Sequence, residues 1–267
     1  DFTFNGGAGD DTLIINNPSG SLFNPSGGIF FHGQGEDVDG DTLQILGGEV
    51  TTVEHEFTNA SDGFVLYNGT TSITYTGLEP ITDTIAATNR IFTFTGGLET
   101  ITLEDDGDLD DHESRISSSL GEAVTFNHNP LSLVNLTIDT TAGGGADTVE
   151  IEGIDGEFDA NLTVNAGNDD TITVVGPSDI GAGNADLNAG QVNVNAAFTT
   201  TGSVDVNASN QITFAAGGII DATANTIDLT AGNNIQLGQI TTSGSVTVTA
   251  TAGAITDANA GDTVTGN

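Results

Sequence analysis

Positive charge is almost absent from this chain. Its 267 residues include 38 acidic side chains but only two basic ones, Arg90 and Arg115, so the formal net charge is −36. Nucleic-acid binding requires a basic surface that displaces counterions from phosphates, and attraction to an anionic membrane surface requires the same charge. The composition excludes both partners. It also excludes a P-loop and Schiff-base chemistry, because both require a lysine.

Cysteine, methionine and tryptophan are missing as well. Without cysteine the chain has no disulfide, no iron–sulfur cluster and no cysteine-ligated zinc. No apolar run approaches the roughly 18 residues of a membrane-spanning helix, so membrane insertion is not expected. The chain opens directly in a strand-like stretch with no initiator methionine or signal peptide. We therefore expect either a processed mature protein or a piece of a longer one.

The residues that are present are typical of a folded β protein. Only 15% of residues are charged and 36% are hydrophobic, which is unlike the composition of a disordered chain. The apolar residues are mostly Val, Ile, Leu and Phe in short alternating runs, separated by turns rich in glycine and aspartate.

A repeated unit organises these runs: a short alternating strand, a Gly/Asp turn and a second short strand. The first strands of successive units begin at residues 2, 29, 64, 91, 136, 162 and 192. Beyond about residue 186 the charges thin out and the spacing approaches 20 residues. The sequence therefore predicts an irregular acidic region, residues 1–140, and a regular region, residues 141–267, in one continuous rod.

This periodicity predicts the fold. A period of 20–35 residues with two or three strands per repeat is typical of a solenoid. We predict an all-β parallel β-helix of about ten rungs, less regular in its N-terminal half. At about 4.8 Å per rung such a rod is roughly 50 Å long. A pair of antiparallel sandwiches is the alternative, because the repeats of residues 1–140 are longer and less even.

Acidic turns are the candidate metal sites. Residues 6–14 fit the calcium-binding nonapeptide G-G-x-G-x-D-x-U-x, with Asp10 and Asp11 in the turn. Asp147, Asp169 and Asp170 occupy the same place in degenerate copies. The alternative is that these aspartates only cap backbone amides at the corners.

Two further acidic patterns suit a hard cation. Asp37, Asp39 and Asp41 alternate around a glycine, which allows several oxygens to converge. The densest cluster requires a bound cation or full solvation, because its charges repel one another; its members are Glu104, Asp105, Asp106, Asp108, Asp110 and Asp111, beside His112 and Glu113. We predict Ca²⁺ at these turns, with solvated loops as the alternative.

No catalytic residue is expected. The four histidines, His32, His55, His112 and His128, follow no zinc-motif spacing, and we predict surface or packing roles for them. A lyase acting on acidic sugars needs basic groups that this chain lacks. A glycosidase needs only two carboxylates, but sugar clefts carry aromatic platforms and this chain has no tryptophan.

Two stretches resemble known families. Residues 229–257, with Leu229-Thr230-Ala231-Gly232-Asn233-Asn234-Ile235 and Ser243-Gly244-Ser245-Val246-Thr247-Val248, resemble the repeats of filamentous-haemagglutinin-like surface proteins. Residues 6–14 resemble the repeats of RTX-type secreted proteins. The mixture is similar to large repeat-rich bacterial surface proteins, although the RTX-like copies after the first are degenerate.

The resemblance implies an extracellular, right-handed parallel β-helix at the cell surface. We expect a structural subunit or segment of a self-associating fibre or adhesive matrix that is stabilised by Ca²⁺. Its large partners would be other copies of itself or neighbouring repeats, together with surface glycans. The alternatives are a passive stalk segment of a giant adhesin and, less favoured, a β-helix glycoside hydrolase.

Overall fold

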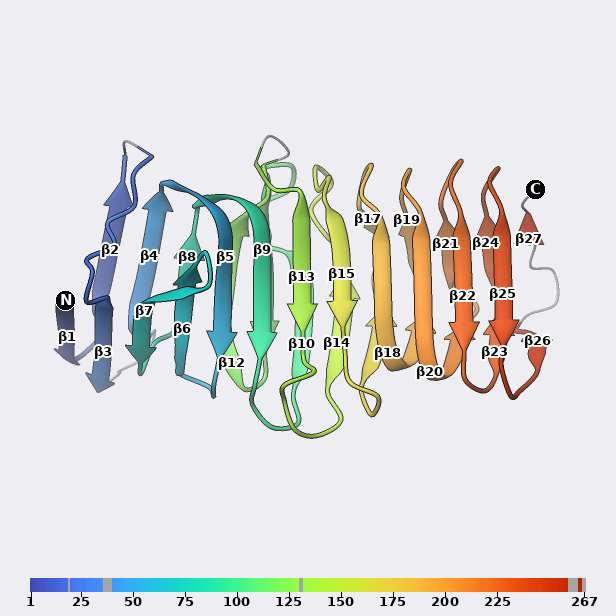
Figure 1. Ribbon diagram of the computed structural model, residues 1–267, viewed down its shortest axis with the longest axis horizontal. Coiled ribbons are helices and arrows are strands. Elements are labelled where there is room, and N and C mark those ends of the chain that lie inside the picture. Colours follow the sequence, from blue (N-terminus) through green and yellow to red (C-terminus); the bar gives the residue numbers. More distant parts are fainter. Residues whose placement is uncertain (19, 36–39, 130–131, 259–263, 266–267) are drawn as a thin grey trace.

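The computed structural model describes residues 1–18, 20–35, 40–129, 132–258 and 264–265. Within these residues the chain is all β and contains no helix. The strands form one elongated stack, with the two termini at opposite ends (Figure 1). No described segment is a helix long and apolar enough to span a bilayer.

The strands and their bounds, in chain order, are β1 (Phe2–Ala8), β2 (Thr12–Asn17), β3 (Ile29–Gly35), β4 (Thr42–Gly47), β5 (Glu49–Phe57), β6 (Asp62–Tyr67), β7 (Thr70–Thr76), β8 (Ile81–Asp83), β9 (Ala86–Phe94), β10 (Thr100–Asp105), β11 (Glu113–Ser118), β12 (Gly121–Asn127), β13 (Asn135–Asp139), β14 (Thr148–Glu152), β15 (Asn161–Asn165), β16 (Thr171–Val174), β17 (Ser178–Asp179), β18 (Ala185–Val194), β19 (Ala197–Thr199), β20 (Val204–Phe214), β21 (Ile219–Asp221), β22 (Ile227–Ala231), β23 (Ile235–Leu237), β24 (Gln239–Thr241), β25 (Val246–Ala250), β26 (Ile255–Asp257) and β27 (Val264–Thr265).

The alternating sequence of each strand places one set of side chains inside the stack. In β15, Leu162 and Val164 are buried while the residues on either side of them are only half-buried. Successive strands repeat this pattern in register, so the buried residues form continuous columns of Val, Ile, Leu and Phe. Phe57 and Phe94, for example, stack with ring centroids 4.7 Å apart.

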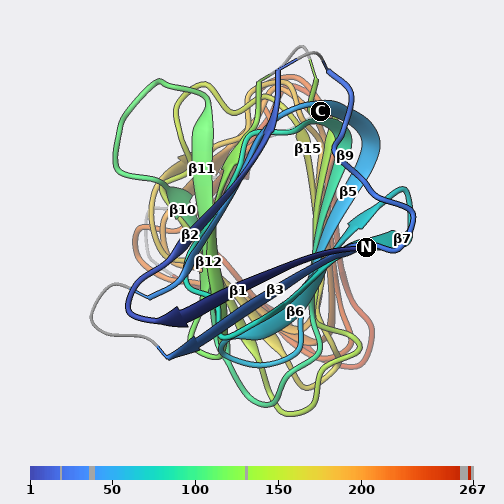
Figure 2. The same ribbon diagram turned by 90° about the vertical axis from the view of Figure 1, so that its left-hand side faces the viewer.

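Most strand pairs are parallel and join successive passes of the chain. β18 pairs along its length with β20, so Leu187 lies beside Val206 and Val192 beside Ile212. A 22-stranded sheet is nearly closed and barrel-like in cross-section (Figure 2), and β17, β19, β21, β24 and β27 form a second sheet that is parallel throughout.

Two antiparallel meanders make the larger sheet mixed rather than purely parallel, which differs from the sequence prediction. β6 lies antiparallel between β5 and β7, and β11 lies antiparallel between β10 and β12. The first meander turns at Asn68 and Gly69, whose φ values of 52° and 75° are those of a tight hairpin turn. The parallel order then resumes, because β9 pairs with β5 and β14 pairs with β10. The irregularity is confined to the N-terminal half.

Both ends of the stack expose strand edges and core columns. Among the described residues, β1 and β2 pair only with β3 and β4, and β25, β26 and β27 pair only with β22, β23 and β24. Ile255 is 48% exposed, whereas its register partner Ile235 is fully buried; Val264 is 53% exposed beside the buried Ile240. At the other end Phe2 is 38% exposed above the buried Ile29.

Candidate functional site

Buried aspartates at the corners link one pass of the chain to the next. Asp41 Oδ1 accepts the backbone N–H of Asp11 at 2.7 Å. Asp170 Oδ1 accepts the N–H of Asp147 at 2.9 Å, and Asp147 Oδ1 accepts the N–H of Glu99 at 2.9 Å. These contacts are the capping role named as the alternative to calcium. Burial raises the pKa of Asp147, and the nearby charge of Asp170 adds to the rise while the Glu99 amide opposes it.

One corner retains an unsatisfied oxygen. Asp41 is fully buried and its Oδ2 has no hydrogen-bond partner. The carbonyl oxygen of Gly77 and Asp41 Oδ2 both crowd the position that a side chain on Gly33 would occupy. Carboxylate and carbonyl oxygens converge here, and such oxygens are the ligands of a hard cation.

The remaining predicted turn residues are scattered. Asp11 is half-buried, and Asp10 and Asp169 are exposed. Asp37 and Asp39 lie outside the described residues. The structure thus brings Asp11 to Asp41 and Asp147 to Asp170, but it does not gather the predicted turn residues into one site.

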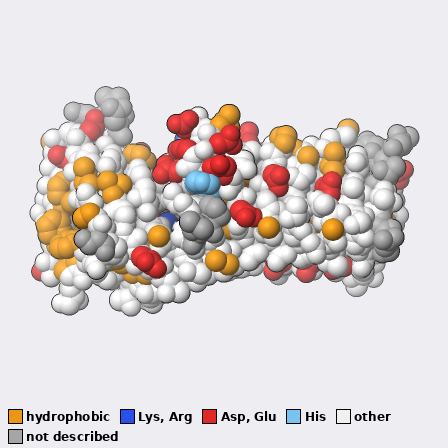
Figure 3. Space-filling view, turned by 90° about the horizontal axis from the view of Figure 1, so that it is seen from above, with side chains coloured by type: hydrophobic (Ala, Val, Ile, Leu, Met, Phe, Trp, Pro, Cys, Tyr) orange, Lys and Arg blue, Asp and Glu red, His pale blue; other side chains and the backbone are white. Residues whose placement is uncertain are grey.

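The densest acidic cluster lies in the loop between β10 and β11, where acidic side chains gather on the surface around a histidine (Figure 3). Carboxylate oxygens of Asp106, Asp111 and Glu113 lie within 4.8 Å of one another, close enough to share a cation. We call these three residues the carboxylate trio. Asp108 and Asp110, also predicted, are in the same loop, and Asp105 is the last residue of β10; all three are outside the trio.

Electrostatics of the trio favour a bound cation. Burial raises the pKa of Glu113, and the charges of Asp111 and Asp106 raise it further. Arg115 does not neutralise the trio, because its Nε faces Glu104 at 3.6 Å from Oε1. Oxygen ligands without nitrogen or sulfur suit Ca²⁺ or Mg²⁺.

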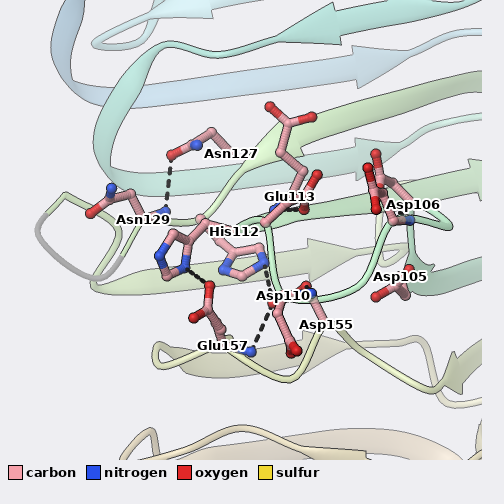
Figure 4. Close-up of polar contacts among 12 residues, drawn as sticks. Asp105, Asp106, Asp110, His112, Glu113, Asn127, Asn129, Asp155 and Glu157 are labelled. Carbon is pink, nitrogen blue, oxygen red and sulfur yellow. Dashed lines mark hydrogen bonds and ion pairs between the residues drawn. The ribbon is translucent and has the colours of Figure 1, made fainter.

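Two histidines meet two carboxylates beside the same loop (Figure 4). His112 Nδ1 lies 3.1 Å from Glu157 Oε2, and His128 Nε2 lies 3.4 Å from Asp155 Oδ1. The two imidazole rings are perpendicular, with centroids 6.1 Å apart. Asp155 also accepts the backbone N–H groups of Asp110 and Glu157 at 2.9 and 2.8 Å. We call His112, His128, Asp155 and Glu157 the histidine–carboxylate cluster.

Apart from the position of His112 beside the acidic run, no motif or spacing in the sequence predicted this cluster. Its members come from the β10–β11 loop, the end of β12 and the loop after β14, which only the second meander brings together. Burial lowers the pKa of His128 below its usual value; Asp155 is the strongest of the groups that oppose this. His128 is therefore neutral near pH 7, with a lone pair on one ring nitrogen.

A second charged group lies wholly inside the stack. Asp83 Oδ2 contacts His55 Nε2 at 2.9 Å and Arg90 Nη1 at 2.5 Å, and all three side chains are fully buried. Arg90 also donates to the carbonyl oxygen of Ile85 at 2.9 Å and lies over the Phe126 ring. Burial alone would raise the pKa of Asp83, but Arg90 and His55 lower it to about 2. This is a structural ion pair, since neither partner reaches the surface.

Comparisons with known proteins do not assign the chain to a family. No family model matches it, and neither a curated protein nor a solved structure is similar to it.

Proposed function

We propose that this protein is a structural, extracellular β-solenoid that forms part of a self-associating surface fibre or adhesive matrix and binds Ca²⁺ at its acidic turns. In this proposal the parallel passes of the chain are rungs of a right-handed coil, and the two meanders are local insertions into it. The in-register pairing of β13, β15, β18, β20, β22 and β25 supports this interpretation.

The open ends of the stack carry the proposal. Ile255 and Val264 at one end, and Phe2 at the other, continue columns that are fully buried one strand earlier. An uncovered core column and an unpaired strand edge both favour pairing with another chain segment. Other copies of the protein, or neighbouring repeats of a longer chain, offer complementary edges.

Sedimentation velocity over a concentration series tests self-association. We expect the sedimentation coefficient to rise with concentration in Ca²⁺. Ile255→Lys and Val264→Lys should abolish the rise, because a lysine places an unpaired charge in the contact between two ends. Leu98→Lys is the matched control: Leu98 is an exposed apolar residue, but it lies in the middle of the stack. A single concentration-independent species in the unmodified chain would contradict the proposal.

Calcium binding is supported by the unpaired Asp41 Oδ2 and by the carboxylate trio. A cation at the trio relieves repulsion between its carboxylates, and a cation at Asp41 pairs with the buried Oδ2. Either one stabilises the folded chain by mass action. We expect a chelator to lower Tm by several degrees, and monovalent salt to restore only a small part of it.

The variants Asp41→Asn and Asp106→Asn should reduce the response to the chelator. Glu49→Gln, which removes one charge from an exposed position on β5, should leave it intact. If the melting curve is the same with and without excess chelator, the calcium proposal fails.

A further inference from the structure

The histidine–carboxylate cluster has a feature that packing does not explain. His128 is fully buried, and neither of its ring nitrogens has a well-formed hydrogen bond; Nε2 faces Asp155 Oδ1 at 3.4 Å, and backbone groups of His128 and Glu113 lie close enough to raise its pKa. Nδ1 of His112 is also buried and lacks a hydrogen bond, although it lies 3.1 Å from Glu157 Oε2, because the angle does not suit one. Buried polar atoms are nearly always paired, since leaving one unpaired costs free energy. Three imidazole nitrogens without well-formed hydrogen bonds, two of them facing carboxylate oxygens, therefore point to a shared ligand.

We propose that His112, His128, Asp155 and Glu157 bind a divalent transition-metal ion of the Zn²⁺ class. This site goes beyond the calcium sites of the proposed function, because its ligand chemistry is different. Imidazole nitrogen with carboxylate oxygen suits Zn²⁺, Cu²⁺ or Ni²⁺, whereas Ca²⁺ is bound by oxygen alone. The chain has no cysteine, so histidine is its only nitrogen or sulfur ligand suited to such an ion.

The distances within each pair fit two neighbouring ligands of one ion. Among the described residues only the carboxylate trio has three ligand atoms within 4.8 Å of one another, so the two pairs must move closer together when the ion binds. Ligand atoms at about 2.1 Å from a tetrahedral ion lie roughly 3.4 Å from one another. The His112–Glu157 and His128–Asp155 pairs, at 3.1 and 3.4 Å, have this separation. Two imidazoles that share an ion have centroids roughly 5–6.5 Å apart, by the same bond length, and these centroids are 6.1 Å apart.

The buried pair is fixed and the outer pair is adjustable. Asp155 is held by two backbone N–H groups, and His128 packs against Phe158 at 5.1 Å between ring centroids. His112 and Glu157 are partly exposed on loops, so they can turn toward His128 when an ion binds. Closure of this kind is usual, because metal sites are rarely fully formed before the metal binds.

Co²⁺ and Zn²⁺ titration of the whole chain tests the site. We expect one Co²⁺ per chain to bind with the visible absorption of a nitrogen-ligated ion and with paramagnetically shifted imidazole protons, and Zn²⁺ to displace it. His112→Gln and Glu157→Gln should each weaken binding by 10-fold or more, a loss typical of metal-site variants. Both positions are partly exposed, so these variants avoid the folding risk of a change at the buried His128.

Two controls separate this site from the rest of the molecule. His32→Gln, at a histidine of β3 whose Nδ1 contacts Thr76 Oγ1 at 3.1 Å, should bind Co²⁺ like the unmodified chain. The triple variant D106N/D111N/E113Q removes the carboxylate trio and should retain the imidazole signature. Wild-type binding by His112→Gln and Glu157→Gln, or loss of binding only in the triple variant, would overturn the proposal. Either result leaves the chelator and sedimentation tests of the proposed function unaffected.

Discussion

Arg90 is one of only two cations in the chain, and it lies in the interior. Its guanidinium faces Asp83 and the carbonyl oxygen of Ile85, so the buried charges neutralise each other. The sequence did not predict this pair, because Asp83 and Arg90 lie in different strands, β8 and β9. The two side chains meet because β8 and β9 both direct them into the interior of the stack. His55, for which a surface or packing role was predicted, is the third buried member of this group, with Nε2 2.9 Å from Asp83 Oδ2.

Replacing Arg90 should therefore lower the unfolding free energy. Arg90→Met leaves the buried Asp83 carboxylate without its cation, and loss of one partner of a buried ion pair costs about 3–5 kcal/mol. Arg115→Met removes the other cation from a partly exposed position and should change the unfolding free energy by less than about 1 kcal/mol. Urea denaturation measures both. Equal effects of the two substitutions would contradict the buried-pair account.

The buried imidazole of His55 predicts a pH dependence. Burial lowers the pKa of His55 below 6.5, and Arg90 contributes to this, while Asp83 and Glu54 oppose it. Below about pH 6.5 the unfolded chain therefore binds a proton that the folded chain does not, so the unfolding free energy falls as pH falls. A second loss follows between about pH 4 and pH 2, where the unfolded carboxyl of Asp83 is protonated before the folded one.

His55→Gln keeps an N–H donor for Asp83 but cannot titrate. We expect its unfolding free energy to fall less between pH 7 and pH 5.5 than that of the unmodified chain, measured by urea denaturation at each pH. His32→Gln, the same substitution at a partly exposed histidine of β3, is the matched control. An identical slope in His55→Gln would mean that His55 is not buried in its neutral form.

At the scale of elements, alternation identified the strands and left their pairing open. The predicted strand segments 136–138, 149–151, 162–164 and 172–174 lie within β13, β14, β15 and β16. The meanders escaped prediction because a strand that folds back has the same alternation as one that continues forward. The irregular spacing of residues 1–140 marked the region where they occur, but not the reversal of strand direction.

Gly190 lies where two successive passes of the chain are in close contact, so a substitution there should destabilise the fold. Gly190 interrupts the register of β18 with β20, and a side chain there would collide with the carbonyl oxygen of Asn168 in the preceding pass. Gly190→Ala should therefore lower the unfolding free energy by several kcal/mol, since two backbones must separate. Gly97→Ala is the matched control, because open space surrounds Gly97. Thermal unfolding compares the two, and equal Tm values would show that the passes are not packed this closely.

At the scale of the whole molecule, the shortage of cations shapes how the stack meets its surroundings. Arg90 is buried in its ion pair with Asp83. Among the described residues, Arg115 is therefore the only lysine or arginine side chain at the surface. The acidic exterior must then be balanced by ions from solution. Composition predicted this requirement. The carboxylate trio lies within the acidic run that the sequence singled out, whereas the histidine–carboxylate cluster could not be predicted because it depends on contacts between segments distant in the sequence.

The proposed fibre requires the stack to continue from one chain segment to the next through its open ends. Electron microscopy of the purified chain in Ca²⁺, at increasing protein concentration, tests it most directly. We expect straight filaments one stack wide, with an axial spacing of about 4.8 Å between rungs, and short rods when Ile255→Lys and Val264→Lys are combined. Uniform single rods of the unmodified chain at high concentration would contradict it.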